Sequence, residues 1–202
     1  MSEALLPDGS DRLALRISVG VAAVGAIITV AAAIARLSEV AAGHDIPVTV
    51  LLSETSVGLP LGPNGADVTA TVDTATILVN DPEPATLFAL WAEPIWLALA
   101  VLAGLWLATV FFLRIARGEI FTRGASRLAL AGGLVFAAGW AGSLLFSTMS
   151  ANGALAAVSD GTYDQISMFV SLTPILVILF LGGLGSALQI GEKLQRETAG
   201  LV

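Results

Sequence analysis

The chain has 202 residues, of which 56% are hydrophobic and 12% are charged, and its mean hydropathy is +0.88. A soluble domain carries roughly 25% charged residues, so this composition excludes an ordinary soluble protein and indicates a membrane protein. The net charge of −7 excludes nucleic-acid binding through a basic patch. Because the chain has no cysteine, disulfides, thiolate metal sites and cysteine nucleophiles are excluded as well.

Four apolar runs are long enough to cross a bilayer core as helices, which takes roughly 20 residues. They cover residues 17–35, 95–113, 128–146 and 168–188, and none contains Asp, Glu, Lys, Arg or His. The first run could instead be a secretory signal, but it exceeds the usual apolar region of about 7 to 15 residues. We therefore predict an all-α membrane protein with four transmembrane helices.

The basic residues predict the orientation of these helices, because cytoplasmic loops of membrane proteins are enriched in Lys and Arg. All basic residues but one fall before the first run, between the second and third, or after the fourth: Arg12, Arg16, Arg114, Arg117, Arg123, Arg127, Lys193 and Arg196. Only Arg36 lies on the other side, which carries most of the acidic residues. We expect a membrane protein whose segments 1–16, 114–127 and 189–202 are cytoplasmic.

The long loop of residues 36–94 is expected outside the cytoplasm and is the one loop large enough for a folded element. Alternating β-type residues at 48–52, 68–73 and 76–79, separated by glycines and prolines, predict a small β element of two or three short strands. So small a hairpin is marginally stable alone, so we expect it to pack on its own membrane end or on a partner.

Two features near the outer membrane surface have alternative interpretations. Trp91 and Trp96 are typical of the interfacial belt, which favours Glu93 at the level of the lipid headgroups. If the second helix began at Ala85, Glu93 would instead lie inside it and Pro94 would kink it. The second outer loop, residues 147–167, is short and polar, and a small amphipathic helix is expected at residues 154–158.

Small and polar residues within the spans predict close helix packing. In the first span they recur on one helical stripe: Ser18, Ala22, Gly25, Thr29, Ala32 and Arg36. The alternative is a polar path lined by Ser18 and Thr29. In the fourth span, Thr173-Pro174 predicts a kink.

Candidate catalytic groups are almost absent. His44 beside Asp45 has no second histidine or cysteine near it in sequence, which favours an exposed loop histidine over a metal ligand. The spans carry no acid, base or nucleophile constellation, so we predict no enzyme, no catalytic or metal-binding residues and no cofactor.

Two cytoplasmic segments carry a more specific pattern. Residues 111–122 read FFLRIARGEIFT, and residues 191–197 read GEKLQRE ahead of a Gly-Leu-Val end. Together they resemble the bacterial four-helix membrane family known as domain of unknown function 2975, although Ile120 stands where that family usually has proline. The resemblance marks these candidate interaction residues: Arg117, Gly118, Phe121, Thr122, Arg127, Leu128, Gly191, Leu194, Gly200, Leu201 and Val202.

Members of that family are often encoded beside small helix-turn-helix regulators, so the resemblance implies a cytoplasmic regulator as partner. The leading hypothesis is accordingly a membrane component of a regulatory or sensing pair that acts through protein contacts. The alternative is a small-molecule permease or efflux subunit formed by homo-oligomerisation within the lipid bilayer.

Overall fold

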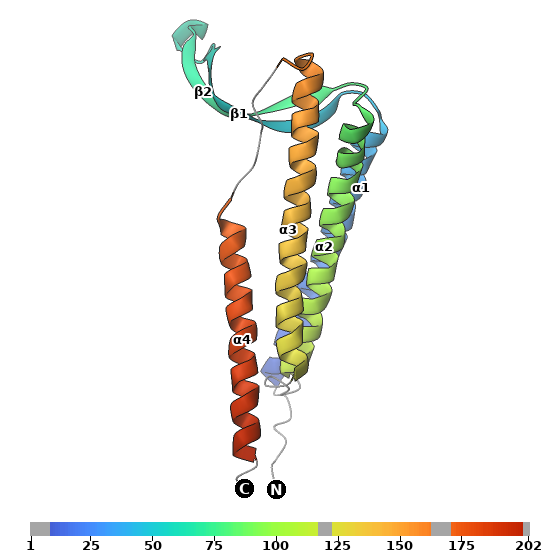
Figure 1. The fold of residues 1–202 in the computed structure, drawn as a ribbon, viewed down its shortest axis with the longest axis vertical. Coiled ribbons are helices and arrows are strands. Elements are labelled where there is room, and N and C mark those ends of the chain that lie inside the picture. The colour runs from blue at the N-terminus through green and yellow to red at the C-terminus, as the bar shows by residue number, and fades with distance from the viewer. Residues whose placement is uncertain (1–8, 117–122, 163–170, 200–202) are drawn as a thin grey trace. The chain divides into compact units, whose positions relative to one another are not determined.

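The computed structural model describes residues 9–116, 123–162 and 171–199. Its elements follow one another as α1 (Gly9–Ala41), β1 (Ile46–Leu59), the short 3-10 helix η1 (Pro63–Gly65), β2 (Val68–Val79), α2 (Pro84–Ala116), α3 (Arg123–Val158) and α4 (Thr173–Ala199) (Figure 1). Within these described ranges, four helices are long and apolar enough to cross a membrane. The prediction of a multi-pass membrane protein with a small β element between its first two helices is confirmed at this level.

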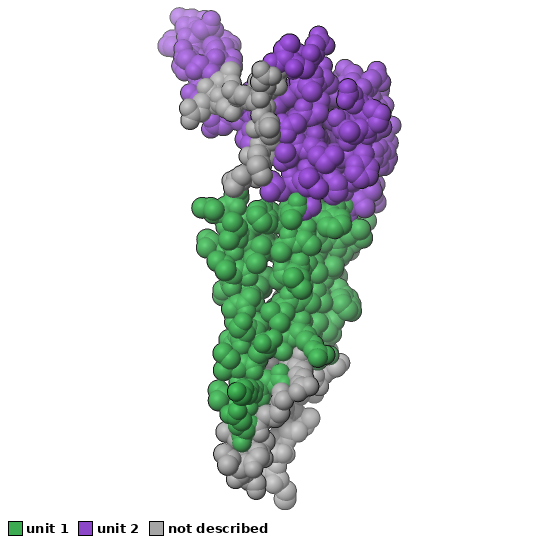
Figure 2. All heavy atoms as spheres, in the orientation of Figure 1, with its two compact units in different colours: residues 1–33, 96–141, 171–202 green, residues 34–95, 142–170 purple. Residues whose placement is uncertain are grey.

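The chain forms two compact units, coloured separately in Figure 2. The helical unit comprises residues 1–33, 96–141 and 171–202, and the hairpin unit comprises residues 34–95 and 142–170. The divisions fall within α1, α2 and α3, so three helices contribute to both units.

Helix α3 continues through the polar residues that were expected to form a loop. Three side chains in this segment donate to carbonyls of the preceding turn: Ser147 Oγ to Leu144 O at 3.2 Å, Ser150 Oγ to Ser147 O at 3.1 Å, and Asn152 Nδ2 to Thr148 O at 2.9 Å. These polar groups are thus satisfied within the helix. The expected separate helix at residues 154–158 is wrong, since this segment is the end of α3.

Two prolines begin helices. Pro84 is the first residue of α2, where its missing N–H costs nothing, and Glu93 and Pro94 therefore both lie inside that helix. Thr173 and Pro174 are the first two residues of α4. The predicted kink at Thr173-Pro174 is wrong, because a proline in the first turn leaves no backbone hydrogen bond to break.

The β element consists of two long antiparallel strands, β1 of 14 residues and β2 of 12, in place of two or three short ones. The runs expected at 68–73 and 76–79 form one strand, because Thr74 and Ala75 pair with Leu51 and Val50. The pairing shifts between Leu51 and Thr55, where β1 carries extra residues opposite β2.

The core of the hairpin unit lies between the base of the hairpin and the ends of three helices. Its buried members are Val40, Ile46, Val48, Val50, Val79, Leu90, Ala151, Ala154 and Leu155. Edge-to-face packing of Phe88 on Phe146, with ring centroids 6.1 Å apart, joins α2 to α3 in the same unit. The hairpin therefore packs on the ends of its own helices, one of the two arrangements expected.

In the helical unit, some of the predicted small residues mark close helix contacts. A Cβ at Gly139 would lie 2.7 Å from Ala100 Cβ, and one at Gly185 would lie 2.8 Å from Leu130 Cδ2. Thr29 Oγ1 donates to Gly25 O at 2.8 Å, so this hydroxyl is satisfied by its own helix. These contacts support the packing interpretation of the small residues.

Candidate functional site

The base of the hairpin is closed by one side chain. Asn80, just after β2, accepts a hydrogen bond from the backbone N–H of Asp45, just before β1, at 2.6 Å. Asp45 and Asp81 have φ values of +52° and +47°, a conformation that Asp tolerates better than most residues. The two connections to the helices are thereby held together.

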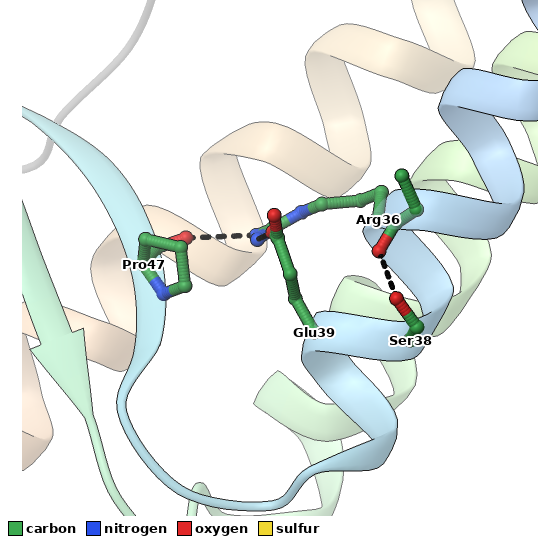
Figure 3. A network of polar contacts seen from close by, with 5 residues as sticks. Arg36, Ser38, Glu39 and Pro47 are labelled. Carbon is green, nitrogen blue, oxygen red and sulfur yellow. Dashed lines mark hydrogen bonds and ion pairs between the residues drawn. The ribbon is translucent and has the colours of Figure 1, made fainter.

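Arg36, at the end of α1, is bound to the first residues of the hairpin (Figure 3). Its Nη1 donates to Glu39 Oε2 at 2.8 Å, and its Nη2 donates to the carbonyl oxygen of Pro47 at 2.9 Å. Proline offers no N–H for strand pairing, and here its carbonyl is occupied as well. The start of β1 is therefore a poor place for another strand to add.

The proximal half of the hairpin, residues 46–51 paired with 74–79, buries one face. Ile46, Val48 and Val50 are at most 3% exposed, and on β2 the inward positions are Ala75, Ile77 and Val79. These positions alternate along each strand, as expected for a sheet with one face on a core.

The distal half, residues 55–59 paired with 68–72, has its apolar residues on the opposite face. On β2 these residues occupy even positions, whereas the core-facing residues of the proximal half occupy odd positions. We call this set the distal face: Val57, Leu59, Val68, Ala70 and Val72. Val57 lies opposite Ala70 and Leu59 opposite Val68, while Val57 is 37% and Val68 45% exposed. Leu59, Ala70 and Val72 are half-buried, so the accessible part of this face is centred on Val57 and Val68.

The hairpin unit is strongly acidic. Its sequence carries the following acidic residues: Glu39, Asp45, Glu54, Asp67, Asp73, Asp81, Glu83, Glu93, Asp160 and Asp164. Its one basic residue, Arg36, is already paired with Glu39. Asp67 and Asp73 flank the distal half of β2 and are exposed. A partner of opposite charge would therefore be attracted to this unit.

The candidate residues from the cytoplasmic pattern are only partly described. Arg127 is exposed and Leu128 half-buried in the first turns of α3, while Gly191 is half-buried and Leu194 57% exposed near the end of α4. They lie on two different helices. The others lie outside the described residues: Arg117, Gly118, Phe121, Thr122, Gly200, Leu201 and Val202.

One contact near that loop was not anticipated. The guanidinium of Arg114, in the last turn of α2, lies against Gly124 at the start of α3, where a Cβ would overlap it. In the sequence this glycine carried no signal beyond its small size, because the contact depends on how two helix ends meet.

His44 is exposed, with Nδ1 3.7 Å from Asp45 Oδ2. Over the ranges that the structure describes, no group of three or more His, Cys, Asp or Glu side chains could hold a metal ion.

Sequence reasoning singled out Arg36 as the one basic residue on its side of the membrane pattern, but it did not foresee the contact of Arg36 with Pro47. It also missed the distal face. The switch from even to odd apolar positions at Asp73-Thr74 is also visible in the sequence.

No family model, curated protein or solved structure matches the chain. The resemblance carried by residues 111–122 and 191–197 stays a prediction.

Proposed function

We propose that this chain is the membrane component of a bacterial regulatory or sensing pair and acts through protein contacts. The observation that carries the proposal is the hairpin, which is anchored at its proximal half and accessible at its distal face. An anchored base with an accessible end is suited to binding another protein.

The proposed orientation puts the hairpin unit outside the cytoplasm of an inner membrane. It rests on the distribution of Lys and Arg, eight of which flank the spans on the other side. Four crossings return the chain to the side on which it started, so both termini belong with the basic loop at 114–127.

On the cytoplasmic side, the basic loop and the tail at 189–202 are the proposed contact with a regulator. Leu194 supports this role because it is a large apolar side chain, 57% exposed, beyond the most apolar part of α4. The chemistry of the partner, a helix-turn-helix protein, comes from the family resemblance alone.

Affinity purification of the full chain from its native membrane in mild detergent, followed by mass spectrometry, tests this proposal. A cytoplasmic regulator should be recovered with the intact chain and lost when Leu194 is changed to Ser. The matched control is Leu172→Ser, which alters an equally apolar and 71% exposed residue immediately before the same helix. If the regulator is recovered equally with Leu194→Ser, with Leu172→Ser and after removal of residues 192–202, the proposed contact at the tail is wrong.

A second function, an oligomeric permease, is favoured by one observation on α4. Cβ atoms at Gly182 and Gly183 would meet nothing within 4 Å, so a small-residue face is open to another helix. If this face joins copies around a path, Gly182→Leu should abolish both oligomerisation and flux in reconstituted vesicles. Gly183→Ala, a small change on the same face, is the control, and flux that survives Gly182→Leu contradicts the permease.

A further inference from the structure

The distal face has three properties that favour a partner. It is apolar, it is exposed at Val57 and Val68, and among the residues that the structure describes it belongs to a two-stranded sheet, in which residues 68–72 of β2 pair with β1 alone. A two-stranded hairpin has few neighbours to pair with, and an uncovered edge offers a row of backbone donors and acceptors.

The proximal half is a poor place for another strand to bind. There both strands have one face buried in the core, and on β1 Pro47 supplies no donor and its carbonyl already accepts from Arg36. Residues 55–59 and 68–72 contain no proline, and this half extends beyond the helix ends in Figure 1. An added strand would therefore pair along the distal half.

Charge selects among the possible occupants. A second copy would bring together two units that each carry ten acidic residues and one basic residue, and this repulsion disfavours self-association. Anionic lipid headgroups are disfavoured for the same reason. A basic segment is attracted, and Asp67 and Asp73 stand at the two ends of the β2 segment it would line.

We propose that the distal half of the hairpin binds an extended basic peptide segment of a partner protein as an additional strand. Backbone hydrogen bonds to the hairpin edge hold the segment, its apolar residues extend the distal face, and its basic residues meet Asp67 and Asp73. This inference rests on the proposed function, because it names the class of partner that the accessible hairpin takes.

The probe is a nine-residue peptide of alternating lysine and valine, with a glutamate-valine peptide of the same length as its control. Binding is measured by calorimetry to the full chain in nanodiscs of uncharged phosphatidylcholine, and empty nanodiscs correct for adsorption to lipid. The lysine peptide should bind, the glutamate peptide should not, and added salt should weaken the binding.

Matched variants locate the site. Val68→Ser should weaken binding by roughly threefold or more, since cross-strand apolar pairs each contribute to sheet formation. Leu78→Ser alters a 58% exposed residue on the same strand and the same face but in the proximal half, and it should leave binding unchanged. Asp67→Asn with Asp73→Asn should weaken binding by roughly threefold, whereas Asp160→Asn should not.

Three results would overturn the inference: no binding of the lysine peptide, binding indifferent to Val68→Ser, or equal effects of the distal and control variants. The last two would mean diffuse attraction to an acidic surface. The affinity purification with Leu194→Ser is independent of this assay, so loss of the peptide site with a retained tail partner refutes the inference alone. A bound peptide without any tail-dependent partner refutes the regulatory pair and keeps the hairpin site.

Discussion

The two halves of the hairpin are built from similar residues and joined by the same pair of strands, but only one half is part of a core. In the proximal half, Val79 is 1% exposed, and in the distal half Val68 is 45% exposed. Both are valines on β2, and they differ in whether their position is odd or even. One strand can thus pack an apolar face on the core in one half and expose an apolar face in the other half. This requires that its apolar residues change between odd and even positions along the strand.

The largest effect is expected from Ile46→Ala, which is compared with Val68→Ala. Ile46 is fully buried, so its truncation should cost about 2–4 kcal/mol of the stability of the hairpin unit. Val68→Ala should change that stability by less than about 0.5 kcal/mol, as surface substitutions usually do. Amide hydrogen exchange at residues 46–51 and 74–79 measures both. Equal effects of the two changes would contradict the division into an anchored and a presented half.

The contact between α2 and α3 beneath the proximal half can be disrupted by adding a methyl group at Gly153. A Cβ at Gly153 on α3 would overlap the buried side chain of Thr86 on α2, so Gly153→Ala should destabilise the hairpin unit by about 1–3 kcal/mol. Gly183→Ala is the control, since that site is open and alanine favours helix by about 1 kcal/mol. Unfolding in SDS, followed by tryptophan fluorescence, should move in opposite directions for the two variants.

Arg36 gives a smaller effect on the same half. Arg36→Gln removes the ion pair with Glu39 and the hydrogen bond to Pro47, and its side chain is 28% exposed, so the expected cost is about 1 kcal/mol. Exchange should speed up at the start of β1 and stay unchanged in the distal half. Uniformly faster exchange along the whole hairpin would show that the two halves unfold as one.

The smallest effect is expected at Asn80. Asn80→Ala leaves the Asp45 N–H without its acceptor at an exposed position, which should cost about 0.5–1 kcal/mol. Asn80→Asp keeps an acceptor oxygen and should behave like the natural chain. Proteolysis of the connection between α1 and β1 reads out the difference, and sensitivity to both substitutions would mean that the amide group is needed for some other contact.

The helices were predictable because each contains an uninterrupted apolar run of bilayer length. Their ends were harder to predict, since α3 continues over Ser147, Ser150 and Asn152 by satisfying those side chains on its own carbonyls. Pro174 shows the same difficulty, because proline begins a helix or kinks one according to where the first turn lies.

The hairpin was predictable in kind and in place, and the change of apolar positions along β2 is visible in the sequence, but the contacts at the base of the hairpin were not predictable. Alternation gives the strands, whereas the pairing shift between Leu51 and Thr55 depends on how β1 meets β2. The bond from Arg36 to Pro47 joins residues eleven apart across the end of a helix. Such a contact follows from tertiary packing, which no local pattern encodes.

The contacts of the Arg36 guanidinium also affect where trypsin can cleave this chain. Trypsin cuts after Lys and Arg, and the sequence has neither between Arg36 and Arg114 or between Arg127 and Lys193. Sealed vesicles with the hairpin unit on their outside should therefore resist trypsin, because the one available side chain there is engaged by Glu39 and Pro47. Vesicles of the opposite orientation should be cut at the basic segments. Trypsin alone can thus report which way the protein faces, and Arg36→Gln should leave the outer surface with no cleavage site at all.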